Sequence, residues 1–129
     1  MGTFNVTVEV AAGPDGPFES MEAMVDTGAT FTVAPASTLH RLGVEPTRRI
    51  RFALADGSRV ERDAGWMVIR VGGIESPSPV VFGEDDGGLV LGSVTLTTLG
   101  LHADLVRQQL VPALACLPGI VLAPDREAA

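Results

Sequence analysis

The sequence predicts an all-β domain with one or two short helices. Turn-forming residues recur at short intervals, the apolar runs between them are brief, and several of these runs alternate apolar with polar side chains. The chain has 129 residues, of which 46% are hydrophobic and 19% are charged. This length and composition suit one folded domain covering residues 1–129.

Strands are predicted at the start of the chain. Thr3–Val10 alternates apolar and polar residues, and after a turn rich in Gly and Pro a second extended segment covers Phe18–Val25. Residues 35–42 predict a short helix, because Pro35 suits a first helical turn and Gly43 suits a stop.

A long hairpin is predicted next. Its arms are Arg48–Ala55 and Ser58–Ala64, and they flank Asp56 and Gly57, the strongest short hairpin signal in the chain. Both arms are polar near the turn, so we expect the tip to project into solvent. The alternative is an ordinary exposed hairpin with no role in binding.

The remaining elements are short. Strands are expected at residues 66–71 and 74–82, and Pro77 and Pro79 place the second of these at a sheet edge. An apolar strand at residues 89–92 then leads into a short helix, for which Ser93 is a possible N-cap and Gly100 a stop. Two small strands around a turn follow in the segment 101–112. Residues 113–129 form an apolar C-terminal extension to which we assign no role.

Composition narrows the function classes. The net charge is −7 and all nine basic residues are Arg, which argues against nucleic acid as the main partner. The Arg residues that crowd the hairpin predict a solvated face rather than a binding patch. Cys116 is the single cysteine, so no internal disulfide is possible. With no membrane-length apolar run and no secretory signal in the sequence, we expect a cytoplasmic protein that does not bind membranes.

Two motifs carry the functional signal. The stretch "MVDTGAT", residues 24–30, sets Asp26 after an apolar strand and before a small polar turn. The stretches "LVLG" and "SVTLTTLGL", together residues 89–101, place an apolar strand ending in Gly before a short helix. In this order, with the long hairpin between them, the motifs resemble the retropepsin-like aspartic proteases, the single-domain relatives of pepsin.

The resemblance implies a closed, barrel-like half-domain of the pepsin and retropepsin type. It implies a homodimer in which each chain contributes one Asp26 to a shared water, since hydrolysis by this chemistry needs two carboxylates. Peptides or unfolded proteins would be the substrates, and no metal or other cofactor is expected. The implied catalytic residues are Asp26, Thr27 and Gly28. The implied substrate-binding residues are Ala29, Thr30, Ala55, Asp56, Gly57 and Ser58.

Other interpretations remain open at this point. Asp, Thr and Gly all favour turns, so the first motif could be a plain turn. A catalytically silent dimeric β-domain could bind extended peptides in the same groove. A metal-dependent hydrolase ranks last, because the sequence lacks a cluster of His and carboxylate residues. Trp66 is expected in the core, and His40 and His102 on the surface.

Overall fold

The computed structural model describes residues 3–114, and the remaining 17 positions, including Cys116 and most of the apolar extension, lie outside the described residues. Nine strands and two short helices are present in this part of the chain. The strands are β1 (Phe4–Ala11), β2 (Glu19–Val25), β3 (Thr32–Pro35), β4 (Pro46–Ala53), β5 (Arg59–Val71), β6 (Ile74–Gly83), β7 (Leu89–Leu91), β8 (Leu101–Asp104) and β9 (Gln109–Pro112). The helices are α1 (Ala36–Leu42) and α2 (Ser93–Leu99).

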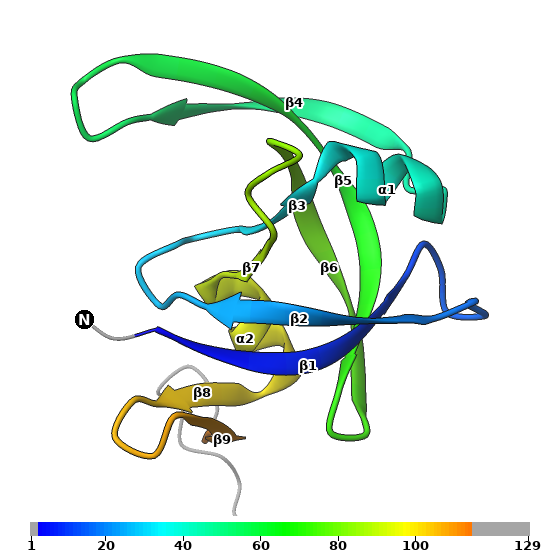
Figure 1. Ribbon diagram of the computed structural model, residues 1–129, viewed down its shortest axis with the longest axis vertical. Helices are drawn as coiled ribbons and strands as arrows, with labels where there is room; N and C mark the ends of the chain where they lie inside the picture. The colour runs from blue at the N-terminus through cyan, green and yellow to red at the C-terminus, as the bar shows by residue number, and fades with distance from the viewer. Residues whose placement is uncertain (1–2, 115–129) are drawn as a thin grey trace, which may run out of the picture.

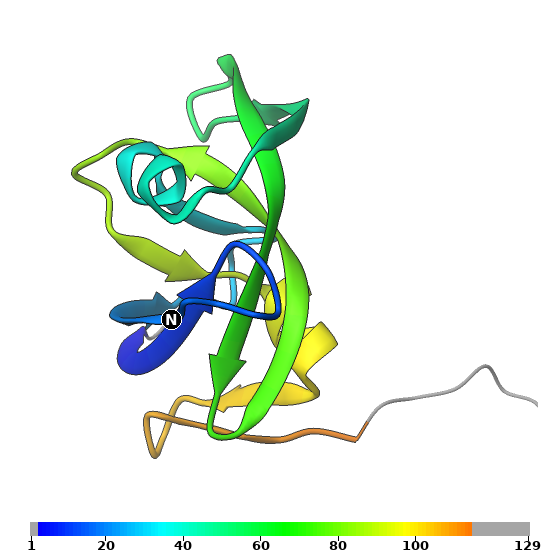
Figure 2. The same ribbon diagram turned by 90° about the vertical axis from the view of Figure 1, so that its right-hand side faces the viewer.

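Six strands form a closed barrel of mixed direction, as the all-β prediction and the family resemblance implied. Their order is β1-β2-β7-β3-β6-β5, and pairing between β1 and β5 closes the ring. The pairs β2–β7 and β3–β6 are parallel, whereas β1–β2, β3–β7 and β5–β6 are antiparallel. Long β5 runs from the top of the molecule to its base, and in Figure 2 it bends around the barrel along this path.

The barrel interior holds one apolar core. Alternating residues of the strands point inward, and Val8, Val25, Ile69 and Leu91 are almost completely buried. Leu39 of α1 and Leu96 of α2 pack against the same core, so each helix covers part of the barrel with its apolar face. Within residues 3–114 no helix has the length and apolar character needed to span a membrane.

The predicted hairpin is a long arm, formed by β4 and the first half of β5, that projects from the top of the barrel (Figure 1). The sequence predicted a break between residues 64 and 66, but β5 is continuous there. Gly65 lies at this point of the strand, and an added Cβ there would lie 2.5 Å from the carbonyl oxygen of Glu45. Glycine at this position allows the segment before β4 to approach β5 closely.

Two further expectations about local structure need correction. Ser93 does not cap α2 but is its first residue, and the N-cap is Gly92, which makes no side-chain hydrogen bond. Trp66 is not in the core, since 58% of its surface is exposed. It faces outward on β5 opposite Pro79 of β6. A tryptophan on the outer face of a strand keeps its ring in solvent, a fact that apolar content alone cannot predict.

Pro77 and Pro79 were predicted to lie at a sheet edge, and this holds for their own part of β6 but not for the whole strand. Strand β6 lies inside the barrel order, between β5 and β3. It pairs with β3 only over Val80–Gly83, however, so Pro77 and Pro79 lie where β6 has β5 as its one paired neighbour. A residue without an N–H group is tolerated there because no second ladder needs it.

Candidate active site

The loop between β2 and β3 holds the "DTGAT" motif at one side of the barrel (Figure 1). The first turn of this loop is closed by its own backbone, because the N–H of Ala29 donates to the carbonyl oxygen of Asp26 over 3.1 Å. The Gly28 N–H donates to Oδ1 of Asp26 over 2.9 Å. An added Cβ on Gly28 would lie 3.3 Å from the same oxygen. Glycine therefore leaves space beside the carboxylate, and its amide fixes the direction of that carboxylate.

The two sequence motifs meet in space at this loop. The N–H of Asp26 donates to the carbonyl oxygen of Leu91, the last residue of β7, over 3.0 Å. Ala29 and Thr30 then accept hydrogen bonds from the N–H groups of Ser93 and Val94, over 2.8 and 3.0 Å. The first N–H groups of a helix lack partners within the helix. Here the candidate loop supplies those partners, which explains why α2 begins without a side-chain cap.

Gly92 allows the loop that carries Asp26 to cross the start of α2 at close range. It is buried, and an added Cβ would lie 2.6 Å from the carbonyl carbon and oxygen of Phe31 and 2.8 Å from the carbonyl oxygen of Thr30. Real Cβ atoms do not approach backbone atoms this closely. The apolar strand of the second motif is therefore followed by Gly92 because the loop that carries Asp26 passes directly over this position.

A buried set of hydroxyl groups supports the loop from below. Thr32 and Thr95 hydrogen-bond through their side chains, and Thr95 also bonds to the Ser78 hydroxyl over 2.7 Å. The Thr32 hydroxyl oxygen accepts the N–H of Gly92 over 3.0 Å. Sequence reasoning missed these residues, although threonines at apolar positions of a strand and of a helix were a usable signal.

The tip of the arm is organised separately from the loop. Asp56 Oδ1 accepts hydrogen bonds from the amide and the hydroxyl of Ser58, over 2.9 and 2.6 Å. These bonds hold the pKa of Asp56 below its usual value, with the hydroxyl contributing most. Of the expected substrate-binding residues, Ala55, Asp56, Gly57 and Ser58 lie at this exposed tip. No hydrogen bond within residues 3–114 connects them to Ala29 or Thr30.

An aromatic contact joins the arm to the candidate loop instead. The rings of Phe31, directly after the loop, and Phe52 of β4 meet edge to face with centroids 6.2 Å apart. Beside Phe52 lies an open hollow of about 340 Å³ between the arm and the barrel. The apolar residues Val33, Phe52, Leu54, Val60 and Val81 line it. Arg62 and Glu84, which form an ion pair over 2.8 Å, border it.

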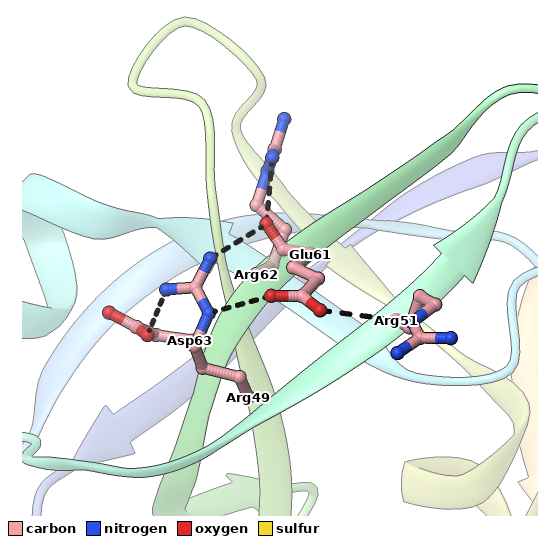
Figure 3. A network of polar contacts seen from close by, with 5 residues as sticks. All are labelled: Arg49, Arg51, Glu61, Arg62 and Asp63. Atoms are coloured by element: carbon pink, nitrogen blue, oxygen red, sulfur yellow. Dashed lines mark hydrogen bonds and ion pairs between the residues drawn. The ribbon is translucent and has the colours of Figure 1, made fainter.

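The arginines of the arm form a network on its solvent face, as expected (Figure 3). Arg49 bonds to Glu61 over 3.2 Å and to Asp63 over 2.9 Å, and Arg51 lies 3.7 Å from Glu61. All of these side chains are well exposed. They pair with acidic residues across β4 and β5 rather than forming a concentrated positive patch.

Another hollow, of about 360 Å³, is lined by Pro17, Phe18, Glu19, Arg41 and Leu42. None of these residues belongs to either motif. The hollow beside Phe52 has no motif residue in its lining either, but the Phe52 ring contacts Phe31, which directly follows the candidate loop.

Comparison with known proteins agrees with this geometry. The profile of a family described as aspartyl protease matches residues 6–102, which cover both motifs and the arm between them. The chain belongs to the aspartyl protease family. A search of curated protein sequences found no significant match.

Solved structures show that this family member has the retropepsin-like fold. The retroviral protease-like domain of Ddi1 from Leishmania major superposes with a TM-score of 0.56 at 19% identity, covering 84% of this chain and 88% of that one. The Simian Foamy Virus (mac) protease gives 0.54 at 17% identity, covering 74% and 90%. A retropepsin-like aspartic protease from Rickettsia conorii gives 0.52 at 21% identity, covering 84% and 91%. Membership of this family supports a peptidase function for the chain.

Proposed function

We propose that this protein is an aspartic endopeptidase that hydrolyses extended polypeptides as a homodimer. The observation that carries the proposal is the way Asp26 is held. Its amide is tied to Leu91, its Oδ1 accepts the Gly28 N–H, and the loop around it rests on α2. A plain surface turn has no need of a buried Gly92 crossing or of a buried hydroxyl network beneath it.

The chemistry requires two carboxylates, but the loop of residues 26–31 contains only one, that of Asp26. A twofold axis beside the loop would bring Asp26 of a second copy against the first, and twofold dimers are the commonest oligomers. Two carboxylates at close range do not both ionise cheaply, so they share one proton. The ionised group takes a proton from the water between them as that water attacks the peptide carbonyl carbon. The protonated group gives its hydrogen to the carbonyl oxygen.

Collapse of the resulting adduct breaks the C–N bond, and a proton passes to the leaving nitrogen. No covalent enzyme intermediate forms in this sequence. Thr27 and Gly28 act as catalytic neighbours in the proposal, Gly28 by orienting the Asp26 carboxylate. Ala29 and Thr30 line the floor of the substrate path. Residues 55–58 form its roof when the arm closes over a peptide and excludes water. The apolar hollow beside Phe52 lies between the arm and the barrel.

The experiment is cleavage of an unfolded protein between pH 4 and pH 7, with and without pepstatin. We expect pepstatin-sensitive cleavage by the native chain, no cleavage by Asp26→Asn, and native activity in the matched control Asp86→Asn in the exposed 84–88 loop. Activity should also fall faster than linearly on dilution, because monomers hold half a site. Cleavage that survives in Asp26→Asn would overturn the proposal. Binding without cleavage by the native chain would favour the silent peptide-binding domain.

A further inference from the structure

The first half of β2 has one open edge. On one side β2 pairs with β1 along its whole length, from Glu19 to Val25. On the other side β2 pairs with β7, but only over residues 23–25. In the part of the chain that the structure describes, no strand lies beside residues 19–22 on this second side. An open strand edge is a template for pairing with another chain.

The hydrogen-bond register shows which backbone groups reach the open edge. The N–H of Asp26 donates to the carbonyl oxygen of Leu91 in β7 over 3.0 Å. Because successive residues of a strand direct their backbone groups to opposite sides, the even-numbered residues of β2 face β7 and the odd-numbered residues face β1. Ser20 and Glu22 therefore direct their N–H groups to the open edge. Neither N–H donates to another backbone group within residues 3–114.

A hollow adjoins the start of this edge. Its volume is about 360 Å³, and its lining comes from the start of β2, the end of α1 and the turn before β2: Pro17, Phe18, Glu19, Arg41 and Leu42. In Figure 1 these ends of β2 and α1 lie on the right, whereas the loop between β2 and β3 that holds Asp26 lies on the left. A strand added to the open edge would run beside the hollow.

The inner face of this edge favours an apolar side chain. Odd-numbered residues of β2 point toward the barrel interior, since Met21 packs against the core and Ala23 is buried. Side chains of an added strand would alternate between this inner face and solvent. Those on the inner face would lie over the hollow, where Phe18 and Leu42 offer apolar surface. A large apolar side chain gains most from burial there.

The outer face of the same edge is acidic. Glu22 is exposed and accepts a hydrogen bond from the Thr7 hydroxyl over 3.0 Å, but it forms no ion pair with another residue of the segment 3–114. Asp15, exposed in the turn before β2, likewise has no cationic partner among the described residues. A cation on the added strand beside Glu22 would form a favourable cross-strand pair. The net charge of −7 also attracts a basic segment at long range.

We propose that the open edge of β2 is a docking site for an extended segment of another protein in which basic and large apolar residues alternate. The segment accepts hydrogen bonds from the N–H groups of Ser20 and Glu22, places its apolar side chains over the hollow, and places its basic side chains beside Glu22. In recognition by strand addition, main-chain bonds give affinity and alternate side chains give specificity. Ser20 lies about 20 Å from Asp26 along β2, at ~3.3 Å per residue. The inference therefore goes beyond the proposed function and does not depend on it.

Binding of synthetic peptides tests the chemistry of the partner. The protein is the full chain carrying Asp26→Asn, which keeps the peptide from being cut. The probe is a fluorescent hexapeptide of alternating lysine and leucine with blocked ends, and its binding is measured by fluorescence anisotropy. We expect saturable binding, and at least tenfold weaker binding when glutamate replaces lysine or alanine replaces leucine. Equal affinity for the three peptides would overturn the proposed chemistry.

Two pairs of variants test the position of the site. Ser20→Pro removes an outward N–H of β2, and its matched control Asn5→Pro removes an outward N–H of β1 at a position without a β5 partner. Glu22→Lys reverses a charge beside the edge, and Glu61→Lys makes the same change on the arm. The peptide dissociation constant should rise at least tenfold in Ser20→Pro and Glu22→Lys and less than twofold in the controls, with circular dichroism confirming that each variant is folded. Equal weakening in variants and controls would remove the site from β2.

Nuclear magnetic resonance and inhibitor competition separate this site from the groove beside Asp26. The peptide should shift the amide signals of Ser20 and Glu22 and leave those of Gly57 and Ser58 at the tip of the arm unchanged. In the native chain, saturating pepstatin should leave the peptide bound. Displacement by pepstatin would place the peptide in the catalytic groove and overturn the docking site. Peptide binding at β2 by a protein without Asp26-dependent cleavage would support the docking site and overturn the protease proposal.

Discussion

The hydroxyl groups of Thr32 and Thr95 hydrogen-bond to each other in the protein interior, although 63 positions separate the two residues in the sequence. Thr32 begins the strand that follows the Asp26 loop, and Thr95 lies in α2, which follows the second motif. This contact ties the two motifs together beneath the candidate site. Both side chains are fully buried, as is Ser78, the other partner of Thr95.

Thr95→Val should test the importance of this network. Valine has a similar shape but no hydroxyl, so Thr32 and Ser78 would each lose a buried hydrogen-bond partner. We expect the free energy of unfolding to fall by about 1–3 kcal/mol, as measured by urea denaturation. Thr97→Val, on the exposed face of the same helix, is the matched control and should change stability by less. Similar losses in the two variants would contradict a structural role for the network.

Gly92→Ala should disturb the point where the motifs cross. The backbone of Gly92 is extended, with φ −100° and ψ 175°, so alanine meets no conformational penalty there. Its methyl group would instead clash with Phe31 and Thr30. Overpacking of this kind costs about 1–3 kcal/mol in unfolding free energy, and the displaced loop should also lose peptidase activity. Gly13→Ala, with open space around the new methyl group, should be close to neutral in both measurements.

The stability of α1 should depend on pH through Asp85. The N–H of Ser37 donates to Asp85 Oδ1 over 2.9 Å, and this bond holds the pKa of Asp85 below its usual value. A carboxylate with a lowered folded-state pKa stabilises the fold above its unfolded pKa of about 3.9 and loses that contribution as the pH falls through the folded value. Asp85→Ala should therefore lower the urea midpoint at pH 7 and match the native midpoint near pH 2.

The control for Asp85 is its neighbour Asp86, which makes no hydrogen bond to other residues of the described segment 3–114. Asp86→Ala should leave the midpoint unchanged at both pH values. If the gap between Asp85→Ala and the native protein persisted at low pH, the carboxylate would not be its cause. The side chain of Asp85 would then act by packing alone.

The ion pairs on the arm should contribute little to global stability. Arg49 and Asp63 are 57% and 41% exposed, and water competes for both charges. A double-mutant cycle with Arg49→Ala and Asp63→Ala should give a coupling energy below about 1 kcal/mol. Added salt should reduce this energy further. A coupling that was larger, or insensitive to 1 M salt, would mean that the network of Figure 3 is shielded from solvent.

Much of the fold was predictable because its signals are local. Alternating residues predicted β1, the Asp56-Gly57 turn predicted the arm, and Gly43 and Gly100 marked the ends of the two helices, where both adopt the left-handed conformation. The Asp26 loop was predictable for the same reason, since a small polar turn after an apolar strand is visible in a few consecutive residues. Local backbone preferences act over such short spans, so the sequence alone specified these elements.

Only the tertiary structure decided how distant residues meet. The outward position of Trp66 depends on which face of β5 the barrel encloses, and the pairing of Thr32 with Thr95 depends on strand order. The need for glycine at position 92 arises from a chain segment some 60 residues earlier that crosses over it. Such contacts form between surfaces assembled from several strands. Their physical cause is the closure of the barrel, which is a property of the whole chain rather than of any one segment.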